Sequence, residues 1–434
     1  MLERWFHIHA AGSTPGREVL GGLTTFLTMA YIAVVNPVFL STAGMPLEGA
    51  ILATCTAAAL ATLLMGLWAN YPIALAPGMG LNAFFTYTVC LGAGVPWPTA
   101  LGIVFWSGIL FLLLTVTGAR KVLVKAVPPV LRLAGAVGIG LFIAFIGLQH
   151  GGIVRADPNT LVSLGDLGTP AALLTLSGLA FTLLLAAAGV RTAIFIGLVC
   201  CTVAGLVTGI LPAPQGFFSV PSLDFPGFRI DLLGALHAKY LPLLLVMLFF
   251  DLFDTLGTLL GIAHEGGFLR DGELPRIDRA MTADSVGTVA GALLGTSTVT
   301  SYIESATGVG VGARTGLANV VTGGLFLVTP FFTPLVAVIG QGTSDGLYPA
   351  TAPALILVGT LMVRAVREID WQDLTEGAPA FLTALLMPLS FSISTGLAAG
   401  IVAYVLVKLA ARRQREVHWL LIVLAVVFCL WPLL

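Results

Sequence analysis

Charge is what this sequence has least of. Only 9% of its 434 residues are Asp, Glu, Lys or Arg, and 57% are hydrophobic, whereas soluble domains contain about 25% charged residues. So little charge excludes an ordinary soluble enzyme or scaffold. We therefore expect an integral membrane protein with the lipid bilayer around it. The formal net charge of −1 also gives no general attraction to nucleic acid.

Cysteine and histidine are scarce as well. The five cysteines lie in apolar runs without the spacing of a disulfide framework or a metal site, so we expect them to be small buried or lipid-facing residues. Among the six histidines, His7 and His9 are close together, but nothing nearby completes a ligand set. We therefore expect no metal and no cofactor. The N-terminal residues also lack the apolar core of a signal peptide.

Long hydrophobic runs fill most of the chain. Counted against turn residues and charges, they predict about fourteen transmembrane spans, the first near 19–43. The predicted fold class is therefore an all-α polytopic membrane protein. The apolar stretch 417–434 is either a short fifteenth span or an interfacial helix. The longest polar gaps, 212–240 and 263–281, are too short for a soluble domain.

Lysine and arginine indicate the orientation. With the N-terminus in the cytoplasm, nearly all of the 20 Lys and Arg residues fall on the inner side, while Arg155, Arg229 and Lys239 fall outside. This predicts a multi-pass protein of the inner (cytoplasmic) membrane. The polar segment 212–240 then divides the spans into halves of about seven. An odd number inverts the second half, as in an inverted repeat. The repeat is inferred from the span count alone.

Three acidic residues lie inside the predicted spans. Asp251 and Asp254 occur in the apolar run 241–262, and Glu304 in the weakly polar stretch 296–311. Each ionised acid costs roughly 2.5–3.5 kcal/mol at the membrane centre, and residues at i and i+3 share a helix face. These acids suggest a polar site that handles substrate or protons. Alternatively, these acids only pair with polar side chains or cap helix ends. This second interpretation applies to Asp254 more than to Asp251 or Glu304.

Two spans are interrupted. The third, near 72–92, contains prolines and glycines up to Gly80, followed by Asn82, which disfavour a continuous helix. The tenth, near 298–313, is rich in Thr, Ser and Gly around Glu304. The two occupy corresponding places in the halves, and a matched pair of broken segments indicates a binding site. Alternatively, these glycines only permit close helix packing.

Several stretches carry a family resemblance. They include APGMGLNAFF at 76–85, FFDLFDTLGTLLG at 249–261 and TSTVTSYIESATGVGVGARTG at 296–316. With them the chain, from about residue 15 to 434, resembles the nucleobase permeases of the nucleobase–ascorbate / nucleobase–cation symporter-2 group. The resemblance is strongest to the adenine–guanine–hypoxanthine permease branch.

The resemblance implies two inverted repeats of seven helices that form a core domain and a gate domain, with a short strand and a half-helix in each broken span. It also implies a homodimer. The implied segments are a cytoplasmic N-terminal segment (1–18), the core (19–118 and 241–339), the gate (119–211 and 340–411), an outside linker (212–240) and an apolar C-terminal segment (412–434).

The resemblance also assigns roles to residues. Asp251 would contact the purine base, Glu304 would contact its other polar edge, and Asn82 with Gly80 would complete the substrate site. Asp254 would belong to the same site and affect proton coupling.

Asp284, near the start of the ninth span, would support the site from behind. Purines carry N–H donors that carboxylates can accept and acceptors that Asn82 or backbone N–H groups can answer. Because burial and a neighbouring carboxylate favour the neutral acid, we expect at least one of Asp251, Asp254 and Glu304 to carry a proton near neutral pH. The resulting hypothesis is an importer of hypoxanthine, adenine and guanine driven by proton symport.

Other readings stay open. The same fold can carry uracil, xanthine or another small solute; an anion carrier would favour a basic residue at the site, where the sequence indicates acids and no cation. An intramembrane aspartyl enzyme using Asp251 and Asp254 is a second alternative. The i, i+3 spacing argues against it, because such enzymes usually place their acids on different helices. A channel is the third.

Overall fold

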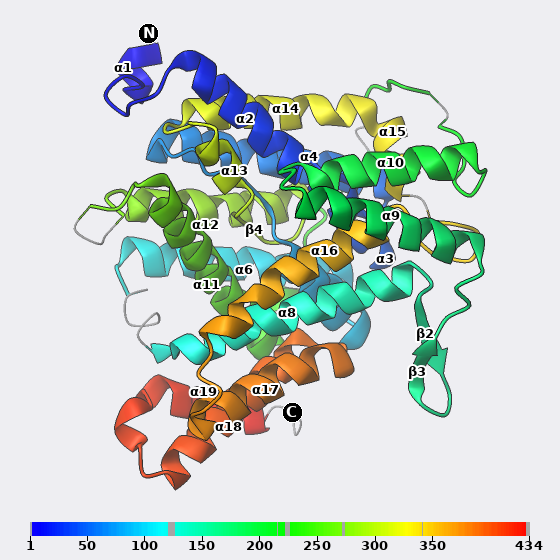
Figure 1. The fold of residues 1–434 in the computed structure, drawn as a ribbon. Helices are drawn as coiled ribbons and strands as arrows, with labels where there is room; N and C mark the ends of the chain where they lie inside the picture. Colours follow the sequence, from blue (N-terminus) through cyan, green and yellow to red (C-terminus); the bar gives the residue numbers. More distant parts are fainter. Residues whose placement is uncertain are drawn as a thin grey trace.

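The protein is a bundle of helices that lie side by side (Figure 1). The computed structural model describes residues 2–119, 126–214, 216–221, 226–270, 274–340 and 342–430. Parts of the predicted segments 119–211, 212–240 and 412–434 lie outside these residues. Eight described helices are long and apolar enough to cross a membrane: Pro15–Thr42, Leu47–Ala69, Trp97–Val116, Pro129–His150, Pro170–Ala187, Ala238–Gly266, Leu317–Gly340 and Ile393–Ala410. Shorter helices and broken segments occupy the other expected spans.

The elements of the first half are α1 (Leu2–Phe6), α2 (Pro15–Met29), α3 (Ile32–Thr42), α4 (Leu47–Leu64), η1 (Met65–Ala69), β1 (Leu75–Pro77), α5 (Met79–Ala83), η2 (Phe84–Gly92), α6 (Trp97–Val116), α8 (Pro129–His150), β2 (Val154–Asp157), β3 (Leu161–Leu164), α9 (Pro170–Ala187) and α10 (Ala193–Val207). Local chemistry sets several of their ends. Thr14 caps α2 and Thr169 caps α9, each followed by proline at the first helical position.

The elements of the second half are η3 (Gly234–Leu236), η4 (Ala238–Tyr240), α11 (Leu241–Gly266), α12 (Ile277–Leu294), β4 (Val299–Ser301), α13 (Ser305–Gly310), α14 (Leu317–Val328), η5 (Thr329–Phe332), α15 (Thr333–Gly340), α16 (Ala352–Val363), η6 (Arg364–Glu368), α17 (Leu374–Leu389), α18 (Ile393–Ala410), η7 (Gln414–Glu416) and α19 (Trp419–Leu430). Gly267 and Gly295 end α11 and α12 in the left-handed conformation, which glycine adopts without steric cost.

The two broken spans meet in the middle of the bundle. Strands β1 and β4 pair antiparallel, with Leu75 opposite Ser301 and Pro77 opposite Val299. A short helix follows each strand, α5 after β1 and α13 after β4. The strand and half-helix expected in each broken span are therefore present. Pairing satisfies backbone groups that the prolines and glycines have freed from helical bonding, as membrane depth requires.

The first predicted span, near 19–43, corresponds to Pro15–Thr42 and contains a turn. This two-residue turn at Ala30 and Tyr31 separates α2 from α3. Sequence patterns did not indicate this turn, because both flanking segments are continuous apolar runs. The turn brings Tyr31 toward β4 and α13, as described below.

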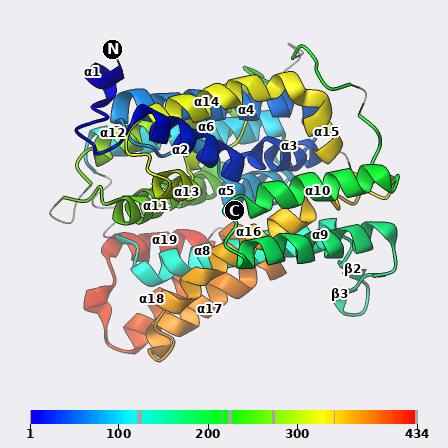
Figure 2. The same cartoon turned by 45° about the horizontal axis from the view of Figure 1, so that its top comes forward.

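The helices form two groups. Helices α2 and α4 pack against α14, and α6 packs against α12. Separately, α8 packs against α16 and α17, and α17 against α18. Figure 2 shows the first group above and the second below. Each group thus combines helices that are far apart in the sequence.

The C-terminal helix α19 packs against α18, and its buried face consists of Leu421, Leu424, Ala425 and Phe428. Its 12 residues span only about 18 Å at 1.5 Å per residue, short of the roughly 30 Å hydrocarbon core. The described part of this segment is therefore too short to be a fifteenth span.

Candidate functional site

A cavity of about 1330 Å³ lies between the two helix groups. Its wall is mostly apolar and includes aromatic side chains from α11. Both groups also contribute polar and charged residues to the wall, among them Thr28, Arg132, Arg191, Asp254, Glu304 and Thr307. Such an apolar cavity with a few convergent polar groups is the usual form of a small-molecule site.

Two of the predicted acids share this cavity. Asp254 reaches it from α11, and Glu304 from the residue directly before α13. They lie close enough to interact electrostatically. The hydroxyl of Thr300 donates to Asp254 Oδ2 at 3.5 Å, and that of Tyr31 donates to Glu304 Oε1 at 2.7 Å. The cavity therefore offers two carboxyl groups held by neighbouring hydroxyl groups.

Asp251 lies behind the cavity rather than on its wall. It is fully buried and accepts a hydrogen bond from the hydroxyl of Thr288 on α12 at 3.2 Å. The sequence placed it on the same face as Asp254. However, residues three apart on an α-helix are still separated by about 60° around its axis. The cavity-facing side of α11 passes through Phe250, Phe253, Asp254 and Gly257. The expected contact of Asp251 with a substrate in this cavity therefore finds no support in the geometry.

Asp284 accompanies Asp251 in this buried layer. It is also fully buried, interacts electrostatically with Asp251, and accepts a hydrogen bond from the Ser301 hydroxyl at 3.2 Å. The Oδ1 atoms of both aspartates have no hydrogen-bond partner among the described residues. Asp284 thus lies behind the cavity wall, where it interacts electrostatically both with the buried Asp251 and with Asp254 on the wall.

Asn82 and Gly80 have different positions. Asn82 is fully buried; its amide donates to the Pro77 carbonyl at 3.2 Å and its carbonyl accepts from the Ser297 hydroxyl. It ties α5 to the segment before β4 and does not line the cavity. Gly80 does line it. A Cβ there would lie 2.6 Å from Cγ2 of Ile139 on α8, so the close approach of the two helix groups requires glycine at this position.

The cations of the cavity wall were not predicted from the sequence. Arg132, Arg191 and Arg364 line the cavity, where no basic residue was expected. The Arg132 guanidinium lies 5.4 Å from the centroid of the Phe253 ring, and Arg191 donates to the Thr307 carbonyl at 3.3 Å. Both come from the ends of spans, where arginines read only as orientation signals. No sequence pattern shows that their long side chains reach the cavity.

Comparisons with known proteins decide the family. Residues 16–399 match the Permease family (Xan_ur_permease). This chain belongs to that permease family. Among its relatives, the guanine/hypoxanthine permease PbuG of Bacillus subtilis is 45% identical over 99% of each chain. The adenine permease AdeP of Escherichia coli is 40% identical over 99% of this chain and 95% of its own. The resemblance found in the sequence is confirmed.

A solved structure shares the fold. The transmembrane domain of the cyanobacterial bicarbonate transporter BicA superposes with a TM-score of 0.61, covering 89% of this chain and 97% of its own at 17% identity. The permease is therefore a multi-pass helical membrane protein with a transporter fold. Because it belongs to a permease family, it is a transporter, and the alternative of an intramembrane aspartyl enzyme is set aside.

An aromatic cluster joins the two groups at the far end of α8. Tyr87 of η2 bonds His150 of α8 through Oη and Nε2 at 3.1 Å. The rings of Phe39, Phe142 and Phe391 pack around Tyr87 at centroid distances of 5.4–6.2 Å. The cavity, by contrast, includes Pro129 and Arg132 from the beginning of α8. The groups of the permease are thus separated at one end of α8 and joined at the other.

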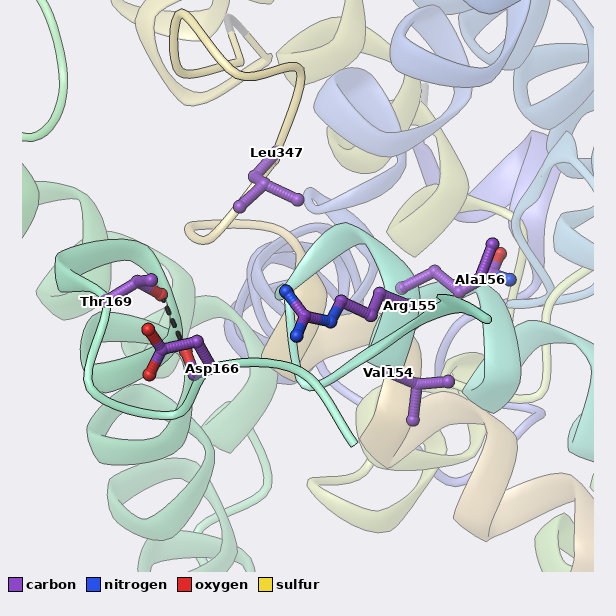
Figure 3. Close-up of a pocket in the computed structure, with 8 residues that line it drawn as sticks. Val154, Arg155, Ala156, Asp166, Thr169 and Leu347 are labelled. Atoms are coloured by element: carbon purple, nitrogen blue, oxygen red, sulfur yellow. Dashed lines mark hydrogen bonds between the residues drawn. The ribbon is translucent and has the colours of Figure 1, made fainter. Parts of the chain in front are cut away.

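A second, smaller hollow of about 330 Å³ lies beside the β2–β3 hairpin. Figure 3 shows Arg155, Asp166 and Leu347 on its wall, and the Thr169 hydroxyl donating to the Asp166 carbonyl at 3.0 Å. It includes Gln149 from the last turn of α8, so a helix length separates it from Arg132. None of the predicted site residues lines this hollow, which we do not assign to transport.

Proposed function

We propose that this permease imports the purine nucleobases hypoxanthine, guanine and adenine across the cytoplasmic membrane by proton symport, with its N-terminus in the cytoplasm. The main support is the pair Asp254 and Glu304 on one cavity wall, at the crossing of the two broken spans. The named activities of PbuG and AdeP support purines as the cargo. An arginine-rich cavity without acids would instead suit an anion.

The chemistry of a purine matches this wall. Each carboxylate accepts N–H groups from the base, and the guanidinium of Arg132 can donate to a ring nitrogen or carbonyl oxygen. The aromatic side chains of Phe249, Phe250 and Phe253 also line the cavity and give the flat ring an apolar surface to pack on. When a base with the wrong edge occupies the cavity, it shields these polar groups from water without pairing them, which is how such a site discriminates.

The architecture proposed is two inverted repeats of seven spans. The strand and short helix that occur once in each half support it. The contacts of α2 and α4 with α14, and of α8 with α16, support a core of 19–118 and 241–339 and a gate of 119–211 and 340–411. Transport would move one domain against the other, opening the Tyr87–His150 cluster while closing the cavity. A homodimer follows from the family resemblance.

Proton coupling is assigned to the carboxyl groups together. A chain of hydroxyls leads inward from the cavity: Thr300 donates to Asp254, and Thr255 and Thr300 lie 2.9 Å apart. Asp284, the neighbour of Asp251, lies close enough to both Thr255 and Asp254 to interact with them electrostatically. A proton taken up at the wall therefore has a polar route to the buried aspartates. Protonation would permit purine loading from outside, and release of the proton would follow on the inside.

The test is uptake of labelled hypoxanthine, adenine, guanine, xanthine and uracil by cells lacking their own permeases, with and without a protonophore. Purine uptake that collapses with the protonophore is the expected result. Uptake of xanthine or uracil alone would assign the same fold to another base. Glu304→Gln and Asp254→Asn should each abolish purine uptake while leaving the amount of membrane-inserted protein unchanged. Normal uptake by both variants would overturn the site.

A further inference from the structure

We infer that Tyr31 positions Glu304 and weakens one of its two carboxylate oxygens as an acceptor, so that Tyr31 sets the preference of the permease among purines. This inference rests on the proposed function and deepens it. Tyr31 does not line the cavity and carries no feature that marks it in the sequence. Its position follows from the turn between α2 and α3, which interrupts the first span for Ala30 and Tyr31.

The Tyr31 side chain has a fixed partner. Its exposed fraction is 1%, so its hydroxyl cannot turn to water. That hydroxyl donates to Glu304 Oε1 at 2.7 Å. Hydrogen bonds to a carboxylate are shorter and about twice as strong as neutral ones. Loss of the contact would leave a buried donor unpaired, which costs free energy, so the Tyr31 hydroxyl remains bonded to Oε1.

The surrounding packing prevents either partner from moving away. Helices α2 and α13 touch through glycines: a Cβ on Gly308 would lie 2.6 Å from the Gly21 carbonyl oxygen. The hydroxyls of Thr28 and Thr307 lie 3.1 Å apart, and Thr307 also donates to the Glu304 carbonyl at 2.6 Å. The backbone that carries Glu304 is therefore held against α2, and the Tyr31 hydroxyl holds its carboxyl group.

The consequence concerns the number of acceptors that a purine meets. A carboxylate has two oxygens, and two adjacent N–H donors can bind both in one plane. Because Oε1 already accepts a hydrogen bond from Tyr31, it keeps one lone pair and is the weaker acceptor, while Oε2 is the stronger one. Hypoxanthine presents a single N–H at position 1 on that edge and can use Oε2. Guanine presents two neighbouring donors, the N1–H and the 2-amino group, and one of them meets the weakened Oε1. Tyr31 therefore favours hypoxanthine over guanine at Glu304.

The experiment compares wild type with Tyr31→Phe, which keeps the ring and removes only the hydroxyl. For hypoxanthine we expect KM to rise about tenfold, with Vmax within about twofold of wild type, because Glu304 loses the charge-assisted hydrogen bond that positions its carboxyl group for the base. For guanine, which gains the freed oxygen, KM should rise less. The ratio of the two KM values should then move toward guanine by about threefold or more.

Tyr71→Phe is the matched control. Tyr71 is also buried, and its hydroxyl accepts a hydrogen bond from the Arg276 backbone N–H at 3.3 Å, but it does not line the cavity. Its loss should leave the KM ratio as in wild type. If Tyr31→Phe does not reach the membrane, Glu304→Asp breaks the same contact from the other side while keeping the charge, and should move the ratio in the same direction.

The outcomes separate this inference from the proposed function. A wild-type protein that takes up no purine overturns the proposed function itself. Purine uptake by wild type, with a KM ratio in Tyr31→Phe equal to that of Tyr71→Phe, overturns only the role of Tyr31. A KM that rises equally for both bases would also refute it, because a merely structural hydroxyl affects all substrates alike.

Discussion

Gly80 gives the sharpest test of how closely the two helix groups must approach. It lines the cavity where α5 meets α8, and an added Cβ would lie 2.6 Å from Cγ2 of Ile139. Carbon atoms normally approach to about 3.5–4.0 Å, so Gly80→Ala drives an overlap of about 1 Å between the groups. Overpacking of this kind costs about 1–3 kcal/mol.

We expect Gly80→Ala to lower the Vmax of purine uptake by about fivefold or more, because raising the barrier of a conformational step by about 1 kcal/mol slows that step about fivefold. A second substitution at Ile139 should rescue uptake by Gly80→Ala. Ile139→Ala removes Cγ2 and should restore much of the lost Vmax. Ile139→Val retains Cγ2, so it should restore little and serves as the matched control.

The assay is purine uptake kinetics in the four-variant cycle, with the thermal midpoint of each purified protein measured alongside. A limiting contact between Gly80 and Cγ2 of Ile139 predicts a coupling energy of about 1 kcal/mol or more when position 139 is Ala, and a much smaller one when it is Val. Equal rescue by both substitutions would show that the Cγ2 contact does not limit transport. Additive losses without rescue would refute the steric argument altogether.

Three further predictions follow from other parts of the molecule. Asp251→Asn, which alters the buried layer behind the cavity, should leave hypoxanthine binding within about threefold of wild type but remove the dependence of uptake on the proton gradient; lost binding with intact coupling would contradict this placement. Tyr87→Phe removes the hydrogen bond to His150 that joins the two groups. A cysteine introduced at position 391 should then react more with a membrane-impermeant thiol reagent added outside. Unchanged labelling would place the closure elsewhere. Outside the spans, hydrogen bonds from Thr375 and from the Arg413 guanidinium, 2.6 Å away, hold the pKa of the Asp373 carboxyl well below its ordinary value. The stabilisation that this carboxylate gives the fold is present above the ordinary pKa of about 4 and is lost as the pH falls. Asp373→Asn should therefore lower the thermal midpoint at pH 7, and the difference from wild type should shrink below about pH 4.

The hydrophobic pattern was sufficient for the class of protein and for the broken spans. Proline and glycine within 76–80 act on the backbone locally, so the interruption of the third span, and the strand expected there, could be predicted from the residues and the family resemblance. The short β1–β4 sheet could not be derived from either segment alone, because each strand is three residues long and exists through its pairing with a partner in the other half of the chain.

The sequence by itself determined that acids lie at membrane depth, since a charged residue within an apolar run is visible in one dimension. The tertiary structure alone decided which of them line the cavity. Helix periodicity gives the angle between Asp251 and Asp254, but the position of α12 decides that the first is buried against Thr288 and that the second lines the cavity. The same holds for Tyr31, Arg132 and Asn82. Their roles depend on contacts between segments far apart in the chain, and side-chain reach across such contacts leaves no periodic trace in the sequence.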